Sequence, residues 1–159
     1  NHTFLIDIFN EYKKMDNNSK LILIGDGYLR NEIKEKVHKL NLDDSVLFLG
    51  KRYDVERLYS AMDIYVMPSL YEGLSISLCE AQINGLKCYT SDDVDKDSNI
   101  TGNVKFISLK ETAETWAKEI FSLDNKRDSD ALQKIPDNFN SEVSYKKLSE
   151  FYENVRCNN

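Results

Sequence analysis

Short apolar runs alternate along the chain with longer stretches of helical periodicity. From His2 to Met15, apolar residues recur at intervals of three and four, as on one face of an amphipathic helix. The apolar runs are too short for helices and are closed by glycine or polar residues, which favours buried strands. The expected strands are Lys20–Ile24, Val46–Leu49, Ile64–Met67, Lys87–Thr90 and Val104–Ile107.

Further helices are expected between and after these strands. Asp54 is placed to cap the one that follows it, and Gly85 can adopt the left-handed conformation that ends another. Continuous apolar strands that alternate with amphipathic helices predict a parallel sheet covered on both faces, a Rossmann-like doubly wound α/β fold. The expected helices are Tyr28–Leu40, Val55–Met62, a helix that contains Cys79–Gln82 and ends at Asn84–Gly85, then Thr112–Leu123, Ser129–Lys134 and Ser141–Val155.

Length and composition narrow the class of protein. The 159 residues, 41% of them hydrophobic, predict one domain over 1–159, with its core over about 1–123 and C-terminal helices over about 124–155. A net charge of -6 argues against a nucleic-acid partner, since such proteins usually carry a basic face. The three cysteines lack the spacing of a zinc site or a disulfide framework, and no apolar run is long enough to span a bilayer. A cytoplasmic location is therefore expected.

The segment after the third expected strand carries the strongest functional signal. Glu72 and Glu80 lie on either side of a turn that contains Gly73, eight residues apart. The same interval occurs in the charged helical stretches Glu111–Glu119 and Glu142–Glu150, so the spacing alone is weak evidence. Position carries the argument, because open α/β sheets bind ligands at the carboxyl ends of their strands. The N–H groups and positive dipole at the start of the following helix favour a phosphate there.

Several linked motifs follow one another along the chain. They are Gly25-Asp26-Gly27, Leu49-Gly50 with the helix after Asp54, Asp63 to Ser69, and Glu72-Gly73-Leu74 through Glu80-Ala81. In this order they resemble the carboxyl-terminal half of a retaining glycosyltransferase of the GT-B architecture, family 4, over roughly Asn1 to Leu109. The chain departs from that pattern at Lys87, where the family usually has proline.

The resemblance implies a donor pocket. Glu80 would accept hydrogen bonds from the ribose hydroxyls and Glu72 from hydroxyls of the donor sugar, since an ionised carboxylate is a strong acceptor. Ser75 stands where family members often carry glycine. The remaining implied contacts are Gly73, Leu74, Ser75 and Ile76 at the pyrophosphate and sugar, Gly25 and Gly27 along the other wall, and Arg52 and Tyr53 beside the nucleobase.

The resemblance also implies an activity. We expect transfer of a sugar, with retention of configuration, from a nucleotide diphosphate sugar, a UDP-sugar, to a glycan or lipid-linked acceptor in surface polysaccharide biosynthesis. No cofactor and no essential metal are expected. The acceptor domain and the basic pair that stabilises the leaving diphosphate are expected before Asn1, so the 159 residues are expected to bind nucleotide without catalysing transfer. Peripheral association of the longer protein with the inner face of the plasma membrane is a further expectation.

Other kinds of site fit less well. Arg30 stands where a dinucleotide-binding loop needs its third glycine, and both histidines precede Gly73–Ser77, against the order of a hydrolase. The acidic run Asp93–Asp97 is followed by neither the glycine nor the glutamate of a calcium loop. Two alternatives remain open. One is a sugar-nucleotide epimerase of the same architecture, which needs acid-base groups near the turn, and the other is a non-catalytic nucleotide-binding α/β module.

Overall fold

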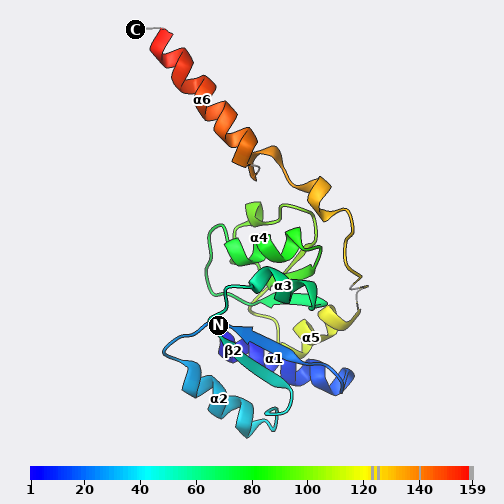
Figure 1. Ribbon diagram of the computed structural model, residues 1–159. Helices are drawn as coiled ribbons and strands as arrows, with labels where there is room; N and C mark the ends of the chain where they lie inside the picture. The colour runs from blue at the N-terminus through cyan, green and yellow to red at the C-terminus, as the bar shows by residue number, and fades with distance from the viewer. Residues whose placement is uncertain (123, 125, 140, 158–159) are drawn as a thin grey trace.

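The computed structural model describes residues 1–122, 124, 126–139 and 141–157 and contains the expected alternation of helices and strands (Figure 1). Every strand pairing between the named strands is parallel, so the Rossmann-like α/β class is confirmed. In chain order the elements are α1 (His2–Met15), β1 (Leu21–Ile24), α2 (Arg30–Lys39), β2 (Val46–Gly50), α3 (Val55–Ser60), β3 (Ile64–Met67), α4 (Ile76–Ile83), β4 (Lys87–Ser91), η1 (Lys96–Ser98), β5 (Val104–Ile107), α5 (Ala113–Ser122), η2 (Ala131–Lys134), η3 (Asp137–Phe139) and α6 (Ser141–Cys157).

The strands form two parallel sheets and not the single sheet that we expected. β1 pairs with β2, while β3, β4 and β5 pair in that order. Across residues 1–122, which hold all the named strands, no ladder of hydrogen bonds joins β1 to β3. The alternation of strands and helices predicts parallel strands, but it does not reveal which strands lie side by side.

One helix, α1, packs against both sheets. Leu5, Ile6 and Phe9 belong to a cluster built on β1, β2 and α2. Ile8 faces the other way, into a cluster with Trp116 that is built on β4, β5 and α5. Figure 1 shows α1 and α5 side by side beneath the larger sheet. The two sheets therefore share a core through α1.

The opposite face of the larger sheet is covered by α3 and α4. Tyr59 from α3 and Leu78 from α4 pack with Cys88 of β4 in a separate cluster. The next residue along β4, Tyr89, joins the cluster on the α1 side, as the alternation of side chains in a strand requires. The expectation of helices on both faces is thus confirmed for this sheet.

Several features of the helices differ from the sequence expectations. α2 begins at Arg30 and not at Tyr28, because the loop after β1 closes with a hydrogen bond from the Arg30 N–H to the Gly27 carbonyl. Asp54 occupies the N-cap of α3, but its carboxylate binds the guanidinium of Arg52 and makes no capping bond. The expected helix at 129–134 is a short 3₁₀ turn, η2.

The C-terminal part of the chain extends outward. Figure 1 shows α6 leading away from the α/β core. Leu123, the last residue of the helix expected over Thr112–Leu123, lies outside the described residues. Among the described helices, none combines the length and the apolar character that crossing a membrane requires.

The segment after β4 holds the turn between β3 and α4. Glu72 forms an isolated parallel bridge with Val94, and its carbonyl accepts a hydrogen bond of 3.2 Å from the Asp95 N–H. The hydroxyl of Ser98 donates to the Gly73 carbonyl, also at 3.2 Å. The backbone of the turn is therefore fixed by residues that follow it by more than twenty positions.

A buried glutamine ties this supporting segment to α4. The Gln82 side chain is fully buried, and its amide nitrogen donates to the Ser98 carbonyl at 2.7 Å. Its amide oxygen accepts from the Thr101 N–H at 3.2 Å. Both ends of the amide are thus satisfied, as burial of a polar group demands.

Substitution of Gly85 tests the packing at the end of α4. Its φ is +77°, and a Cβ there would overlap the Asp128 carbonyl oxygen, whereas Gly102 has a similar φ of +80° and open space around it. Both Gly85→Ala and Gly102→Ala should cost about 1–2 kcal/mol of unfolding free energy through left-handed strain. Gly85→Ala should cost roughly 1–3 kcal/mol more, because the neighbouring backbone must move. Urea denaturation of both variants measures the difference, and equal losses would contradict the contact with Asp128.

Substitution of Gln82 tests whether its buried amide stabilises the segment that supports the turn. Gln82→Leu should lower the unfolding free energy by about 1–3 kcal/mol for each buried group left without a partner, here the Ser98 carbonyl and the Thr101 N–H. Asn84→Ala is the control, because the partly exposed Asn84 side chain donates to the Glu80 carbonyl of the same helix. Denaturation curves should show a much larger loss for Gln82→Leu. Equal losses would argue against the buried amide as a structural link.

Candidate functional site

The structure brings Glu72 and Glu80 to one cavity at the carboxyl end of β3. Glu72 lies in the turn after this strand, and Glu80 lies in the second turn of α4. Together with Pro68 and Ser77 they line a cavity of about 890 Å³ that continues between β1 and β3. The two acids that the sequence singled out therefore share a site, in the place that parallel α/β folds use for ligands.

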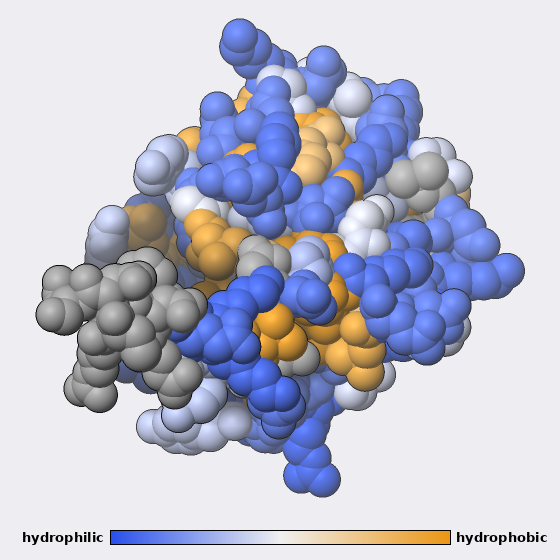
Figure 2. Space-filling view, turned by 90° about the horizontal axis from the view of Figure 1, so that it is seen from above, coloured by the Kyte–Doolittle hydropathy of each residue, from blue (hydrophilic) through white to orange (hydrophobic). Residues whose placement is uncertain are grey.

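The turn presents backbone to this site. Gly73 is exposed, and the position of a Cβ on it is open space. Leu74 and Ile76 point outward, with 56% and 74% of their surface exposed. Viewed from above, patches of hydrophobic side chains lie between hydrophilic ones on the surface of the molecule (Figure 2). At the turn, a ligand can approach the backbone without displacing buried side chains.

Ser75 occupies the N-cap position of α4, but its side chain makes no capping hydrogen bond. Its side chain is buried, and its hydroxyl lies 3.3 Å from the Ser77 Oγ and 3.5 Å from the Met67 Sδ. No side chain among the described residues caps the first N–H groups of α4. These donors, with the positive end of the helix dipole, suit an anion.

Two tyrosines beneath the turn contact the same elements. The Tyr59 hydroxyl lies 3.2 Å from the Ser77 carbonyl and 3.4 Å from a Glu80 carboxylate oxygen, and it donates toward both. The Tyr65 hydroxyl donates to the Ser77 Oγ at 2.9 Å. Burial raises the pKa of Tyr65 to about 12 and raises the pKa of Tyr59 as well. Both phenols therefore stay protonated and act as donors.

The sequence does not reveal this role of the tyrosines, because a tyrosine in an apolar run has the same pattern whether or not its hydroxyl reaches a site. The available signal was Tyr65 within the strand that leads to the turn, two residues from Met67. Strand alternation places both of these side chains on one face, the face that α4 covers.

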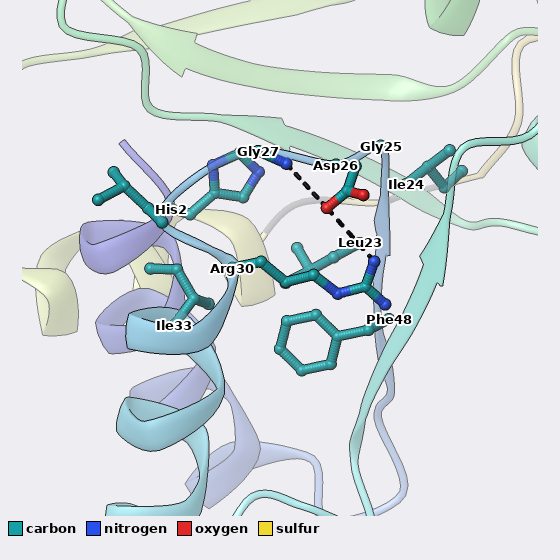
Figure 3. Close-up of a pocket in the computed structure, with 10 residues that line it drawn as sticks. His2, Leu23, Ile24, Gly25, Asp26, Gly27, Arg30, Ile33 and Phe48 are labelled. Atoms are coloured by element: carbon teal, nitrogen blue, oxygen red, sulfur yellow. Dashed lines mark hydrogen bonds and ion pairs between the residues drawn. The ribbon is translucent and has the colours of Figure 1, made fainter.

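Gly25 and Gly27 lie in a second, smaller hollow of about 160 Å³ at the end of β1 (Figure 3). Gly25 has a φ of +117°, a backbone conformation that residues with a side chain rarely adopt. Its N–H donates to the Gly50 carbonyl at 2.8 Å. This bond joins the ends of β1 and β2. The hollow shares Leu23 and Ile24 with the larger cavity, so the two sites adjoin.

Charged side chains close one side of the smaller hollow. The Asp26 carboxylate accepts a hydrogen bond of 2.9 Å from the Gly27 N–H and pairs with the Arg30 guanidinium at 3.4 Å (Figure 3). The Gly27 bond, and then Arg30, lower the pKa of Asp26. His2, at the start of α1, lines both the hollow and the larger cavity. The sequence shows only that both histidines precede the turn, and it does not reveal this proximity.

Arg52 and Tyr53 lie apart from the two acids. The Arg52 guanidinium is paired with the Asp54 carboxylate through two hydrogen bonds of 2.8 and 2.7 Å. Tyr53 is fully exposed. Neither residue lines the two cavities described here. The structure thus leaves both on the surface after β2, without a contact to Glu72 or Glu80.

The acidic run after β4 has a structural role. The side chains of Asp93, Asp95 and Asp97 are exposed, while Val94 and Ser98 between them are buried. Within the part of the chain that the structure describes, no three acidic, histidine or cysteine side chains gather as metal ligands would. The buried members of the run support the turn, and the acidic ones face solvent.

Known proteins resemble this chain in sequence. A family model described as Glycosyl transferases group 1 matches residues 1–136. The putative glycosyltransferase EpsF of Bacillus subtilis (strain 168) is 41% identical over 121 residues, which are 76% of this chain and 32% of that protein. The UDP-Gal:alpha-D-GlcNAc-diphosphoundecaprenol alpha-1,3-galactosyltransferase of Escherichia coli is 38% identical over 86 residues, which are 54% of this chain and 20% of that protein. The chain spans a third or less of the length of these relatives.

Solved structures share the fold. TarM of S. aureus, in a complex with Fondaparinux, alpha-GlcNAc-glycerol and UDP, has a TM-score of 0.79 at 23% identity over 92% of this chain and 31% of its own. The pneumococcal O-GlcNAc transferase GtfA, in a complex with UDP and GlcNAc, has a TM-score of 0.74 at 16% identity over 94% of this chain and 32% of its own. The fold is that of one part of the GT-B glycosyltransferases. With the family model covering most of its length, this chain belongs to the glycosyl transferases group 1 family.

Proposed function

We propose that this chain is the donor-binding domain of a retaining glycosyltransferase, which transfers a sugar from a UDP-sugar to a glycan or lipid-linked acceptor. The observation that carries the proposal is the shared rim of Glu72, Glu80 and the uncapped start of α4. A nucleotide sugar offers hydroxyl donors on two sugars and a diphosphate between them. Two carboxylates beside a helix N-terminus match that order of donors and anion.

Each group has a separate role in the proposed complex. The backbone N–H groups of residues 74–76 bind the pyrophosphate, where the dipole of α4 offsets its charge. Glu80 accepts hydrogen bonds from the ribose hydroxyls, and Glu72 accepts them from the donor sugar. Tyr59 is a positioning residue, because its hydroxyl holds a Glu80 oxygen at 3.4 Å. Binding needs no essential metal ion in this scheme.

The choice of UDP and of acceptor rests on relatives. The name of the Escherichia coli relative specifies UDP-Gal and a diphosphoundecaprenol acceptor, and both TarM and GtfA were solved with UDP. Another relative is the Vi polysaccharide biosynthesis protein VipC/TviE of Salmonella typhi, 33% identical over 81 residues. These names support a role in cell-surface polysaccharide biosynthesis. The free thiols of Cys79 and Cys88 support a reducing, cytoplasmic setting.

Nucleotide binding tests the role of Glu80. UDP should shift the amide resonances of residues 73–80, and Glu80→Gln should weaken binding about 5- to 150-fold, because the ribose hydroxyls lose an ionised acceptor. Glu111→Gln is the matched control, since Glu111 is exposed and remote from both cavities, and it should bind UDP as the parent chain does. Unchanged affinity in Glu80→Gln, or shifts confined to other segments, would refute the assignment.

An assay of sugar transfer tests whether the chain alone holds a complete active site. The 159-residue chain, given a UDP-sugar and a lipid-linked or glycan acceptor, should release no UDP and form no product. The start of α4 supplies only part of the charge compensation that a leaving diphosphate needs, and the proposed acceptor contacts belong to a further domain. Assays of UDP release and of product decide the matter. Sugar transfer by the chain alone would show that all catalytic groups are present within it.

A further inference from the structure

A single arginine, at the opposite end of α4 from the turn, joins the ends of two helices. The Arg127 guanidinium donates to the carbonyls of Tyr59, Ser60 and Met62, at 3.0, 3.3 and 2.6 Å, around the end of α3. Its other terminal nitrogen donates to the carbonyl of Asn84, the residue at the C-cap of α4. One side chain therefore binds the backbone of both helices.

These contacts suit a cation. The last carbonyls of an α-helix have no partner within the helix, and the helix dipole places partial negative charge there. The carboxyl ends of α3 and α4 lie close enough for one guanidinium to reach both, and its planar fork carries donors on two terminal nitrogens. The positive charge of Arg127 therefore stabilises two helix ends that would otherwise repel each other.

The backbone that carries Arg127 is itself fixed. The Asp128 N–H donates to the Gly85 carbonyl at 2.8 Å, and a Cβ on Gly85 would lie 3.0 Å from the Arg127 Cγ. The Asp128 carboxylate accepts a hydrogen bond of 2.7 Å from the Asn103 amide, whose oxygen accepts one of 3.1 Å from Lys87. Lys87, where the chain departs from the family pattern, thus helps to hold the segment that presents the guanidinium.

α3 depends on tertiary contacts for its position. It has only six residues, too few for a stable helix by itself, and Tyr59 is the buried one among them. The Tyr59 hydroxyl lies 3.2 Å from the Ser77 carbonyl and 3.4 Å from a Glu80 carboxylate oxygen. Arg127 binds the carbonyl of this same tyrosine. Tyr59 is therefore held at its side chain by α4 and at its backbone by the guanidinium.

The guanidinium also lies within one helical turn of the second acid. The Asn84 N–H donates to the Glu80 carbonyl at 3.1 Å, and the Asn84 carbonyl accepts from Arg127. The contact between Tyr59 and Glu80 is thus one side of a closed arrangement, and Arg127 completes it on the backbone side. Without Arg127, α3 can move relative to α4, and the phenol then moves away from the carboxylate.

We propose that Arg127 is a positioning residue of the donor site, which holds Tyr59 against Glu80 by binding the carboxyl ends of α3 and α4. Arg127 does not line the cavity that Glu72 and Glu80 share, so it acts through them and not on a ligand. This inference rests on the proposed function, in which Glu80 binds the ribose.

The Glu80 carboxyl signal tests the geometry without a ligand. In a chain with ¹³C-labelled glutamate, Arg127→Gln should shift the Glu80 carboxyl resonance in the same direction as Tyr59→Phe does, because both variants weaken the same contact. Arg57→Gln is the matched control, since Arg57 is exposed in the last turn of α3 and lines neither cavity. It should leave the resonance unchanged. A parent-like Glu80 signal in Arg127→Gln would overturn the proposal.

UDP affinity tests the consequence for binding. Arg127→Gln should weaken UDP binding about 2- to 10-fold, the range expected for one hydrogen bond. In a Tyr59→Phe background the same substitution should cause no further loss, because effects that pass through one contact are not additive. A general structural role would weaken binding equally in both backgrounds. Equal losses, or no loss in either background, would count against the positioning role.

A second variant guards against misfolding. If Arg127→Gln does not fold, both measurements are made on Arg127→Lys, which keeps the charge but replaces the planar fork by one nitrogen, and the same directions are expected. The two measurements also separate this proposal from the proposed function. If the parent chain binds no UDP, the donor site is wrong, while the Glu80 resonance still shows whether Arg127 sets the contact of Tyr59 with Glu80.

Discussion

The packing of α1 against two sheets is the interaction on which the rest of this structure depends. β1 and β3 share no ladder of hydrogen bonds, so the two halves of the α/β core are joined by apolar side chains. Ile6 of α1 faces the half that holds β1, and Ile8 faces the half that holds β4 and α5. Burial of each isoleucine contributes about 1.5–3 kcal/mol. This helix therefore fixes the end of β1 relative to the end of β3, where both hollows lie.

The candidate site is built on that arrangement by a chain of supports. The turn follows β3 at the carboxyl edge of the sheet. The segment after β4 forms hydrogen bonds with the backbone of Glu72 and Gly73, and Gln82 links that segment to α4. Each support uses a buried or backbone group, so the turn is rigid although its outer side chains are exposed. A turn held in this way can offer backbone N–H groups to a diphosphate without reorganising, which is what makes preorganised donors effective.

The sequence predicts the helices, the strands and the turn well, because each of them depends on residues that are close together in the chain. Apolar runs and helical periodicity identify every named strand, and the position of Glu72 and Glu80 around a strand-to-helix turn places them in one cavity. What the sequence does not show depends on distant contacts. The support of the turn by Ser98 and the hydroxyl of Tyr59 beside Glu80 join residues far apart in the chain. Arg52 and Asp54 are close in sequence, but the sequence was equally consistent with Asp54 capping the following helix as with its pairing with Arg52.

The central claim is that the rim of Glu72, Glu80 and the start of α4 binds the donor nucleotide. A structure of the chain with UDP bound is its most direct test. We expect the ribose hydroxyls within hydrogen-bonding distance of the Glu80 carboxylate and the diphosphate against the N–H groups of residues 74–76. UDP bound elsewhere, with the start of α4 free of phosphate, would contradict it.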